Sequence, residues 1–226
     1  MHSFIADLFP ICRSITSEGV WERADVSAAG FPSMCRKSPR SPVLDWTASR
    51  EWNIRDAKVA DASGRRIIDF RESNFHVVSY SVPFRGRLDL DQLREHTYTV
   101  PDHSEWIPYR TPYYVESWGL CLSQRQLEAL PEGEYDVCID TSLRDGHLTY
   151  AECYLPGSTE DEFLFSRHIC HPSLANDNLS GVAVSTFLAE RLARVDHHYS
   201  YRSTHRRERA VLVAKGAAVG GDGSWK

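Results

Sequence analysis

168-HICHPSLANDNLSG-181 is the stretch of sequence that decides the fold class of this chain. A mostly apolar run at 163–170 (FLFSRHIC) leads into it and predicts a buried strand. A helix is predicted from Leu179 to Val195, because its apolar residues recur at helical spacing. A strand, a short polar loop and a helix in this order are typical of an α/β protein.

Three side chains of this stretch are candidate metal ligands: His168, His171 and Asp177. Their positions put imidazole nitrogens and a carboxylate at the carboxyl end of a strand, where ligands bind in open α/β folds. Zinc accepts both donor types, and an Asp can bridge two metal ions. A structural interpretation is also open. Asn176, Asp177 and Asn178 are all good N-cap residues, so Asp177 could cap the helix while the histidines line a loop.

Outside this stretch, short helices and hairpins are predicted. Apolar spacing and turn residues favour helices at 2–16, 89–95 and 122–130. Alternating polarity predicts hairpins that pair 52–60 with 65–70 and 135–143 with 147–155, and a further strand at 76–82. The segment 22–42 has neither helical nor strand periodicity and is expected to be a loop. Four aromatic residues either shape a pocket rim or pack a loop: Trp106, Tyr109, Tyr113 and Tyr114.

Composition limits the class of protein. The chain has 226 residues, of which 42% are hydrophobic and 25% charged, as in a globular protein with a core. The net charge of −5 argues against a nucleic-acid partner. No apolar run is long enough to span a membrane, and the N-terminus does not resemble a secretory signal. The six cysteines form no CxxC pair, which indicates a reducing, cytoplasmic compartment.

The motif HPSLANDNLSG (171–181) resembles the metal-site segment of the M28-type zinc aminopeptidases, where a strand that ends in His precedes an Asp-Asn-x-Ser-Gly helix start. The chain is more closely similar to bacterial aminopeptidase-like proteins often found beside polysaccharide-biosynthesis genes. Further matching sequence segments extend this resemblance through most of the chain: LFPICRSIT (8–16), VLDWT (43–47), EWNIRDAKV (51–59), RESNFHVVSYSVP (71–83), IPYRTPYY (107–114), ESWGLCLS (116–123), LPEGEYDVCIDTSL (130–143) and DGHLTYAECYLPG (145–157).

The resemblance implies an α/β fold: a partial zinc-aminopeptidase-like sheet-and-helix domain with a smaller β-rich insert. We expect residues 1–45 and 151–202 to form the incomplete aminopeptidase-like domain and residues 46–150 to form the insert. Residues 203–226 are expected to be a disordered tail. Residues 21–41 and 203–226 interrupt an otherwise continuous resemblance. We interpret both stretches as out-of-frame translations, the second of which ends the protein early.

The resemblance also implies a zinc-dependent hydrolase of peptide or amide bonds, with one or two zinc ions in intact relatives. Asp177 matches the bridging ligand. The first histidine ligand is either His168, with Cys170 in place of the usual orienting Asp, or His171. The expected substrate is small and peptide-like or an amide, with no nucleic acid or membrane as partner; an oligomer is possible.

The family's paired Glu-Glu and distal ligands have no counterpart after Gly181, so no catalytic residue is assigned. We therefore expect zinc binding to be weak or absent and the truncated chain to be inactive by itself. One alternative is a non-catalytic module that recognises a sugar or peptide in surface-polysaccharide biosynthesis. Another is an unstable fragment with an exposed sheet edge.

Overall fold

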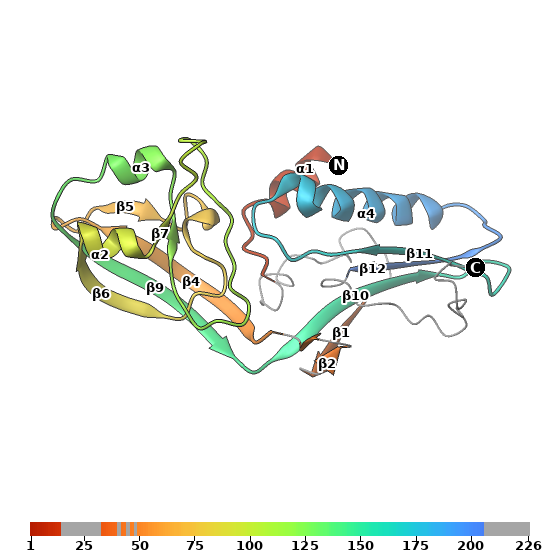
Figure 1. Cartoon of the computed structure of the whole chain (residues 1–226). Coiled ribbons are helices and arrows are strands. Elements are labelled where there is room, and N and C mark those ends of the chain that lie inside the picture. Colours follow the sequence, from red (N-terminus) through yellow and green to blue (C-terminus); the bar gives the residue numbers. More distant parts are fainter. Residues whose placement is uncertain (15–32, 40–41, 44–45, 48, 206–226) are drawn as a thin grey trace.

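The structure is a computed structural model that describes residues 1–14, 33–39, 42–43, 46–47 and 49–205. Two four-stranded sheets dominate the described part of the chain and lie side by side, as Figure 1 shows. The α/β class predicted from the sequence is confirmed, because one of these sheets is packed against helices and contains a parallel strand pair. The division of the chain into an insert and a surrounding domain stays a prediction.

The first sheet is antiparallel throughout. Its order is β5-β4-β9-β6, with β4 at Glu51–Ala60, β5 at Arg66–Asp69, β6 at Phe84–Asp89 and β9 at Glu134–Arg144. The expected hairpin of β4 and β5 is confirmed by their antiparallel pairing around the turn at 61–64. A buried apolar cluster lies on this sheet and includes Val59, Ile68, Leu93, Val137 and Ile139.

Short elements accompany the first sheet. They are the 3-10 turn η3 at Asn74–His76, the helices α2 at Leu90–Glu95 and α3 at Gln124–Glu128, and the parallel pair of β7 (Thr97–Tyr98) and β8 (Leu120–Cys121). Both helices were expected. Each begins with a capping box, in which the Asp89 or Ser123 side chain accepts from the third helical backbone N–H.

The second sheet has the order β1-β10-β12-β11. Its strands are β1 at Ser33–Pro39, β10 at His147–Leu155, β11 at Glu162–Arg167 and β12 at Ser200–His205. The β11–β12 pair is parallel, and α4 at Gly181–Leu192 connects the two strands. Helices α4 and α1, at His2–Leu8, lie on one face of this sheet in Figure 1. A separate two-stranded pair is formed by β2 (Pro42–Val43) and β3 (Trp46–Thr47).

The expected hairpin of 135–143 with 147–155 is wrong. Strand β9 pairs with β4 on one side and β6 on the other, so both of its hydrogen-bonding edges are occupied within the first sheet. The next strand, β10, instead pairs with β1 and β12. The turn at 144–146 therefore carries the chain from one sheet to the other, as Figure 1 shows.

The strand expected at 76–82 is also wrong. This segment forms an isolated bridge between Val77 and Leu120, and Tyr80 has a positive φ of 68° that an extended strand does not allow. Consecutive residues from His76 to Ser81 are buried, so the segment passes through the protein instead of presenting one face to solvent. Strand β6, at 84–89, takes the place beside β9.

Three other expectations change at the second sheet. The run 163–170 is not a buried strand, because among the described strands β11 pairs with β12 alone, at the sheet edge, and Phe163 is 50% exposed. The segment 22–42 is not only loop, since β1 lies within it. The expected 203–226 tail begins inside β12, which extends to His205; residues 206–226 and 15–32 lie outside the described residues.

The N-terminal helix is shorter than the expected 2–16. It ends at Leu8, two residues before Pro10, which cannot continue the backbone hydrogen-bond ladder. Among the described helices, none has both the length and the apolarity needed to cross a membrane.

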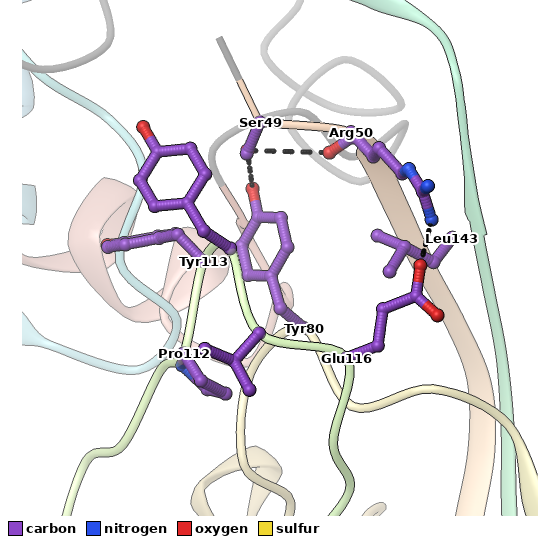
Figure 2. Close-up of a pocket in the computed structure, with 9 residues that line it drawn as sticks. Ser49, Arg50, Tyr80, Pro112, Tyr113, Glu116 and Leu143 are labelled. Carbon is purple, nitrogen blue, oxygen red and sulfur yellow. Dashed lines mark hydrogen bonds and ion pairs between the residues drawn. The ribbon is translucent and has the colours of Figure 1, made fainter. Parts of the chain in front are cut away.

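A cavity of about 130 Å³ lies at the start of β4, and Figure 2 shows its walls. Its lining residues combine aromatic rings with an ion pair and include Tyr80, Tyr113, Tyr114, Arg50, Glu116 and Leu143. The Arg50 guanidinium donates to the Glu116 carboxylate, and Ser49 Oγ donates to Tyr80 Oη at 3.2 Å. The cavity thus has both apolar ring faces and charged groups on its walls.

Candidate metal centre

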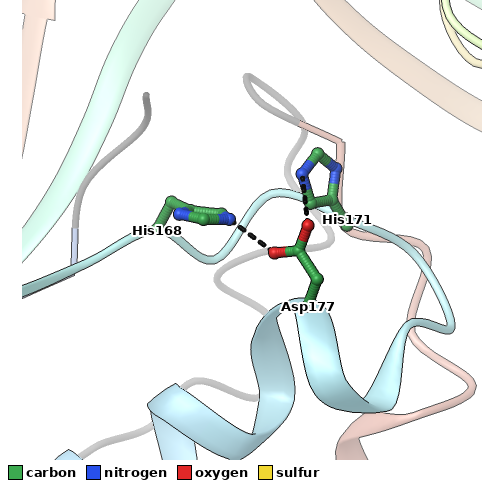
Figure 3. A group of neighbouring side chains, drawn as sticks. All are labelled: His168, His171 and Asp177. Atoms are coloured by element: carbon green, nitrogen blue, oxygen red, sulfur yellow. Dashed lines mark hydrogen bonds and ion pairs between the residues drawn. The ribbon is translucent and has the colours of Figure 1, made fainter. Parts of the chain in front are cut away.

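The structure brings together all three metal ligands predicted from the sequence. His168 directly follows β11, His171 lies in the loop after it, and Asp177 lies in the irregular turn η4 (Ala175–Ser180) that opens α4. Figure 3 shows both imidazole rings facing the Asp177 carboxylate. His168 Nε2 is 2.7 Å from Asp177 Oδ1, and His171 Nε2 is 3.8 Å from Asp177 Oδ2. One ligand atom from each residue lies within 4.8 Å of the others.

The local backbone separates Asp177 from an ordinary helix cap. Asp177 and Asn178 have non-helical backbone angles. The Asp177 carboxylate is directed toward the histidines, as Figure 3 shows, and its two oxygens lie near His168 Nε2 and His171 Nε2. Between the two interpretations of the sequence, the geometry favours a shared site for the carboxylate and the imidazoles.

The site is open on one side and closed on the other. The Asp177 and His168 side chains are 61% and 41% exposed, whereas the His171 side chain is only 14% exposed. A small molecule or ion can therefore reach the carboxylate from solvent while His171 forms the inner wall.

His171 has a partner on its other ring nitrogen. The Tyr109 hydroxyl lies 3.2 Å from His171 Nδ1, and the two rings meet edge to face at 5.4 Å between centroids. Burial raises the pKa of Tyr109 to about 12, so its hydroxyl stays protonated at neutral pH.

The backbone of the site is tied to the N-terminal segment. The buried Arg13 side chain donates to the Leu8 carbonyl at 2.7 Å and to the His171 carbonyl at 2.9 Å. Burial lowers the pKa of Arg13 to about 10, which still leaves the guanidinium charged at neutral pH. Cys170, which the sequence placed where an orienting Asp is usual, lies in an apolar cluster with Trp52 and Tyr80.

A second contact joins the same loop to η3, which accompanies the first sheet. Ser173, with a positive φ of 44°, places its hydroxyl 3.0 Å from the Phe9 carbonyl and within hydrogen-bond distance of Asn74 Oδ1. The Asn74 amide in turn donates to the Pro10 carbonyl at 3.2 Å. The loop that carries the candidate ligands is therefore held by the N-terminal segment and by η3 together.

The donor set fits zinc. Two neutral imidazole nitrogens and one carboxylate are ordinary zinc ligands. Ligand atoms on a tetrahedral zinc ion lie about 3.3 Å apart for bonds of roughly 2.0–2.1 Å. The observed nitrogen–oxygen separations of 2.7 and 3.8 Å bracket that value, so small side-chain rotations would accommodate the ion. Within the described part of the chain, this is the one group of at least three potential ligands.

The sequence did not identify Tyr109, Arg13 or Asn74 as neighbours of the site. Tyr109 and His171 are 62 residues apart, and Arg13 and His171 are 158 residues apart. The spacing of residues along the chain cannot predict contacts at such separations. The dense aromatic segment around Tyr109 did indicate an ordered loop.

Comparison with known proteins shows what the chain is similar to. Residues 51–142 match a family model described as "Domain of unknown function (DUF2172)". A curated protein of Clostridium acetobutylicum, provisionally named as a polysaccharide biosynthesis protein with an aminopeptidase-like domain, is 45% identical over 203 residues. The match covers 89% of this chain and 47% of that protein, so the chain spans about half the length of its curated relative.

Solved structures show the same likeness. A crystal structure from Clostridium acetobutylicum, provisionally described as a peptidase, is 45% identical with a TM-score of 0.87, covering 91% of this chain and 49% of that one. A zinc aminopeptidase of Bacillus subtilis shares the fold, with 11% identity and a TM-score of 0.52; the match covers 90% of this chain and 60% of that one. An M28 peptidase precursor of Shewanella amazonensis also shares it, with 12% identity and a TM-score of 0.53; this match covers 90% of this chain and 62% of that one. The resemblance to aminopeptidase-like proteins is thereby confirmed over nearly the whole chain.

Proposed function

We propose that this chain binds a zinc ion through Asp177, His168 and His171 and carries part of the active site of an aminopeptidase-like hydrolase. The observation that carries the proposal is the convergence of three zinc-type donors at the end of β11 and the start of α4. The likeness to zinc aminopeptidase folds supports it. The substrate would be a small peptide or another amide, in a reducing, cytoplasmic setting.

Each residue has a separate role in this proposal. The Asp177 carboxylate, the most exposed of the three, faces both imidazoles and offers an oxygen to each side. His168 and His171 supply neutral nitrogens, and His171 also closes the inner wall. Zinc supplies Lewis-acid chemistry when it is bound and polarises an amide carbonyl toward attack.

We propose further that the chain by itself does not hydrolyse peptides. Amide hydrolysis needs a general base beside the metal, commonly a carboxylate. Among the residues that the structure describes, the metal-ligand group contains one carboxylate, Asp177, and that one is assigned as a ligand. A base and further ligands would have to come from elsewhere in a longer protein.

Zinc binding by the purified chain tests the proposal. Competition with a chromophoric chelator should show one zinc ion per chain, and zinc should raise the melting temperature by mass action. Asp177→Asn, His168→Ala and His171→Ala should each weaken binding by at least roughly 100-fold, more than loss of an outer partner costs.

Asp91→Asn and His198→Ala serve as matched controls, because they remove an exposed carboxylate and an exposed imidazole outside the candidate site. Both should bind zinc like the wild type. Absence of zinc binding, or equal binding by the Asp177→Asn variant, contradicts the metal site. Turnover of an aminoacyl-p-nitroanilide by the zinc-loaded chain would contradict the proposed inactivity.

A second candidate function is a non-catalytic binding module for a sugar or peptide. The cavity of Figure 2 favours it, because aromatic faces and a charged pair are the groups that recognise such ligands. The provisional name of the curated relative includes polysaccharide biosynthesis. A zinc-free chain that binds oligosaccharides, with loss of binding in Tyr113→Ala, would favour this function over the hydrolase.

A further inference from the structure

We propose that Tyr109 positions His171 for metal binding, so that the aromatic loop (residues 106–118) contributes a supporting residue to the candidate metal centre. This inference rests on the proposed function and goes beyond the three ligands. It assigns a role to a segment that belongs to the region matched by the family model of unknown function, at 51–142.

The two nitrogens of His171 point to different partners. Nδ1 lies 3.2 Å from the Tyr109 hydroxyl, and Nε2 lies 3.8 Å from Asp177 Oδ2. When Nδ1 donates its proton to the Tyr109 oxygen, Nε2 carries the lone pair that a metal ion requires. Metal-binding histidines generally donate their second N–H to an outer partner, which fixes both the tautomer and the ring orientation.

Tyr109 is itself held in place. Its ring packs edge to face against Phe75, with 6.3 Å between centroids, and against His171 at 5.4 Å. The adjacent Arg110 carbonyl accepts from the Ser79 backbone N–H at 2.9 Å. A hydroxyl on a fixed ring and a fixed backbone can orient its partner, whereas a mobile one would follow it.

The contact also has the location expected of a positioning residue. Tyr109 approaches Nδ1 of His171, whereas the exposed Asp177 carboxylate lies near Nε2, so the Tyr109 contact leaves Nε2 free for a metal ion. The Asn74–Ser173 contact joins the loop that contains His171 to η3 independently. Removal of the Tyr109 hydroxyl alone should therefore change the orientation of His171 without detaching the loop.

Tyr109→Phe is the variant that tests this role, because it keeps the ring packing and removes only the hydroxyl. We expect its zinc affinity to fall roughly 10- to 100-fold, the range typical of outer partners of metal ligands. Tyr135→Phe is the matched control, since it removes a hydroxyl that donates to the Pro131 carbonyl in the first sheet. It should bind zinc like the wild type.

A double-variant comparison separates positioning from general destabilisation. In a His171→Ala background, Tyr109→Phe should have no further effect on zinc affinity, while in a His168→Ala background its effect should persist. Equal zinc affinity of Tyr109→Phe and wild type, or an equal additional loss in the His171→Ala background, would overturn the role.

A readout without metal keeps this test separate from the proposed function. Nitrogen-15 NMR of the zinc-free protein at one fixed pH should show His171 protonated on Nδ1 in the wild type and a mixture of tautomers in Tyr109→Phe. If the wild type binds no zinc, the proposed function fails, and this measurement still decides the inference. Identical His171 signals in both proteins would overturn it.

Discussion

Burial determines the chemistry of Cys121 in β8. The residue is 0% exposed, and burial raises the pKa of its thiol to about 12 from an ordinary value of 9.0. The neighbouring charge of Arg110 lowers this pKa only in part. Between these two pH values, the unfolded chain ionises Cys121 while the folded protein keeps it neutral, so the unfolded state binds fewer protons.

The free energy of unfolding should therefore fall as the pH rises above about 9, and Cys121 should account for part of that fall. Comparison with Cys121→Ala isolates its share: by pH 10 the wild type should lose about 1.4 kcal/mol more stability than the variant, relative to pH 8. Urea denaturation at each pH measures both slopes. Parallel stability curves for the two proteins would show that this thiol is not shielded as the structure describes.

Helix α2 shows how local sequence can specify an element completely. The Asp89 carboxylate accepts from the Gln92 backbone N–H at 2.8 Å, and the Gln92 side chain accepts from the Asp89 N–H at 3.1 Å. Leu90 and Leu93 face the buried cluster of the first sheet. The acidic start, the reciprocal cap and the apolar pair are all encoded within a few residues.

Asp89→Ala should destabilise the protein by about 1 kcal/mol, because the helix loses the side chain that satisfies an otherwise unpaired backbone donor. The stability of Asp89→Asn should stay within a few tenths of a kcal/mol of that of the wild type, since the amide oxygen also accepts a hydrogen bond. Denaturant unfolding of the three proteins measures the difference. An Asn variant as unstable as the Ala variant would assign the effect to charge instead of capping.

At the scale of the whole molecule, the two sheets differ in how fully their strands are paired and buried. Strand β9 is paired on both sides and contributes Tyr135, Val137 and Ile139 to the buried cluster. Within the part of the chain that the structure describes, strand β11 is paired on one side only, and Phe163 and Leu164 are exposed there. An unpaired edge and exposed apolar side chains give β11 less protection from local opening.

Native-state hydrogen exchange should reveal this inequality. The amides of β9 should exchange slowest, close to the rate set by global unfolding, and those of β11 should exchange faster on average. Exchange followed by NMR or mass spectrometry under native conditions measures both strands. Equal protection of β9 and β11 would indicate that another group covers the β11 edge in solution.

The sequence by itself determined the elements and residues whose signals are local. It predicted the grouping of His168, His171 and Asp177, helices α2, α3 and α4, and the β4–β5 hairpin, because caps, turns and apolar spacing act within a few residues. Only the tertiary structure decided that β9 and β10 belong to different sheets, since strand partners lie far apart in the chain. It likewise directed both imidazoles toward one carboxylate, because local spacing alone does not decide where side chains point, and it brought Tyr109 to His171 across 62 residues of sequence.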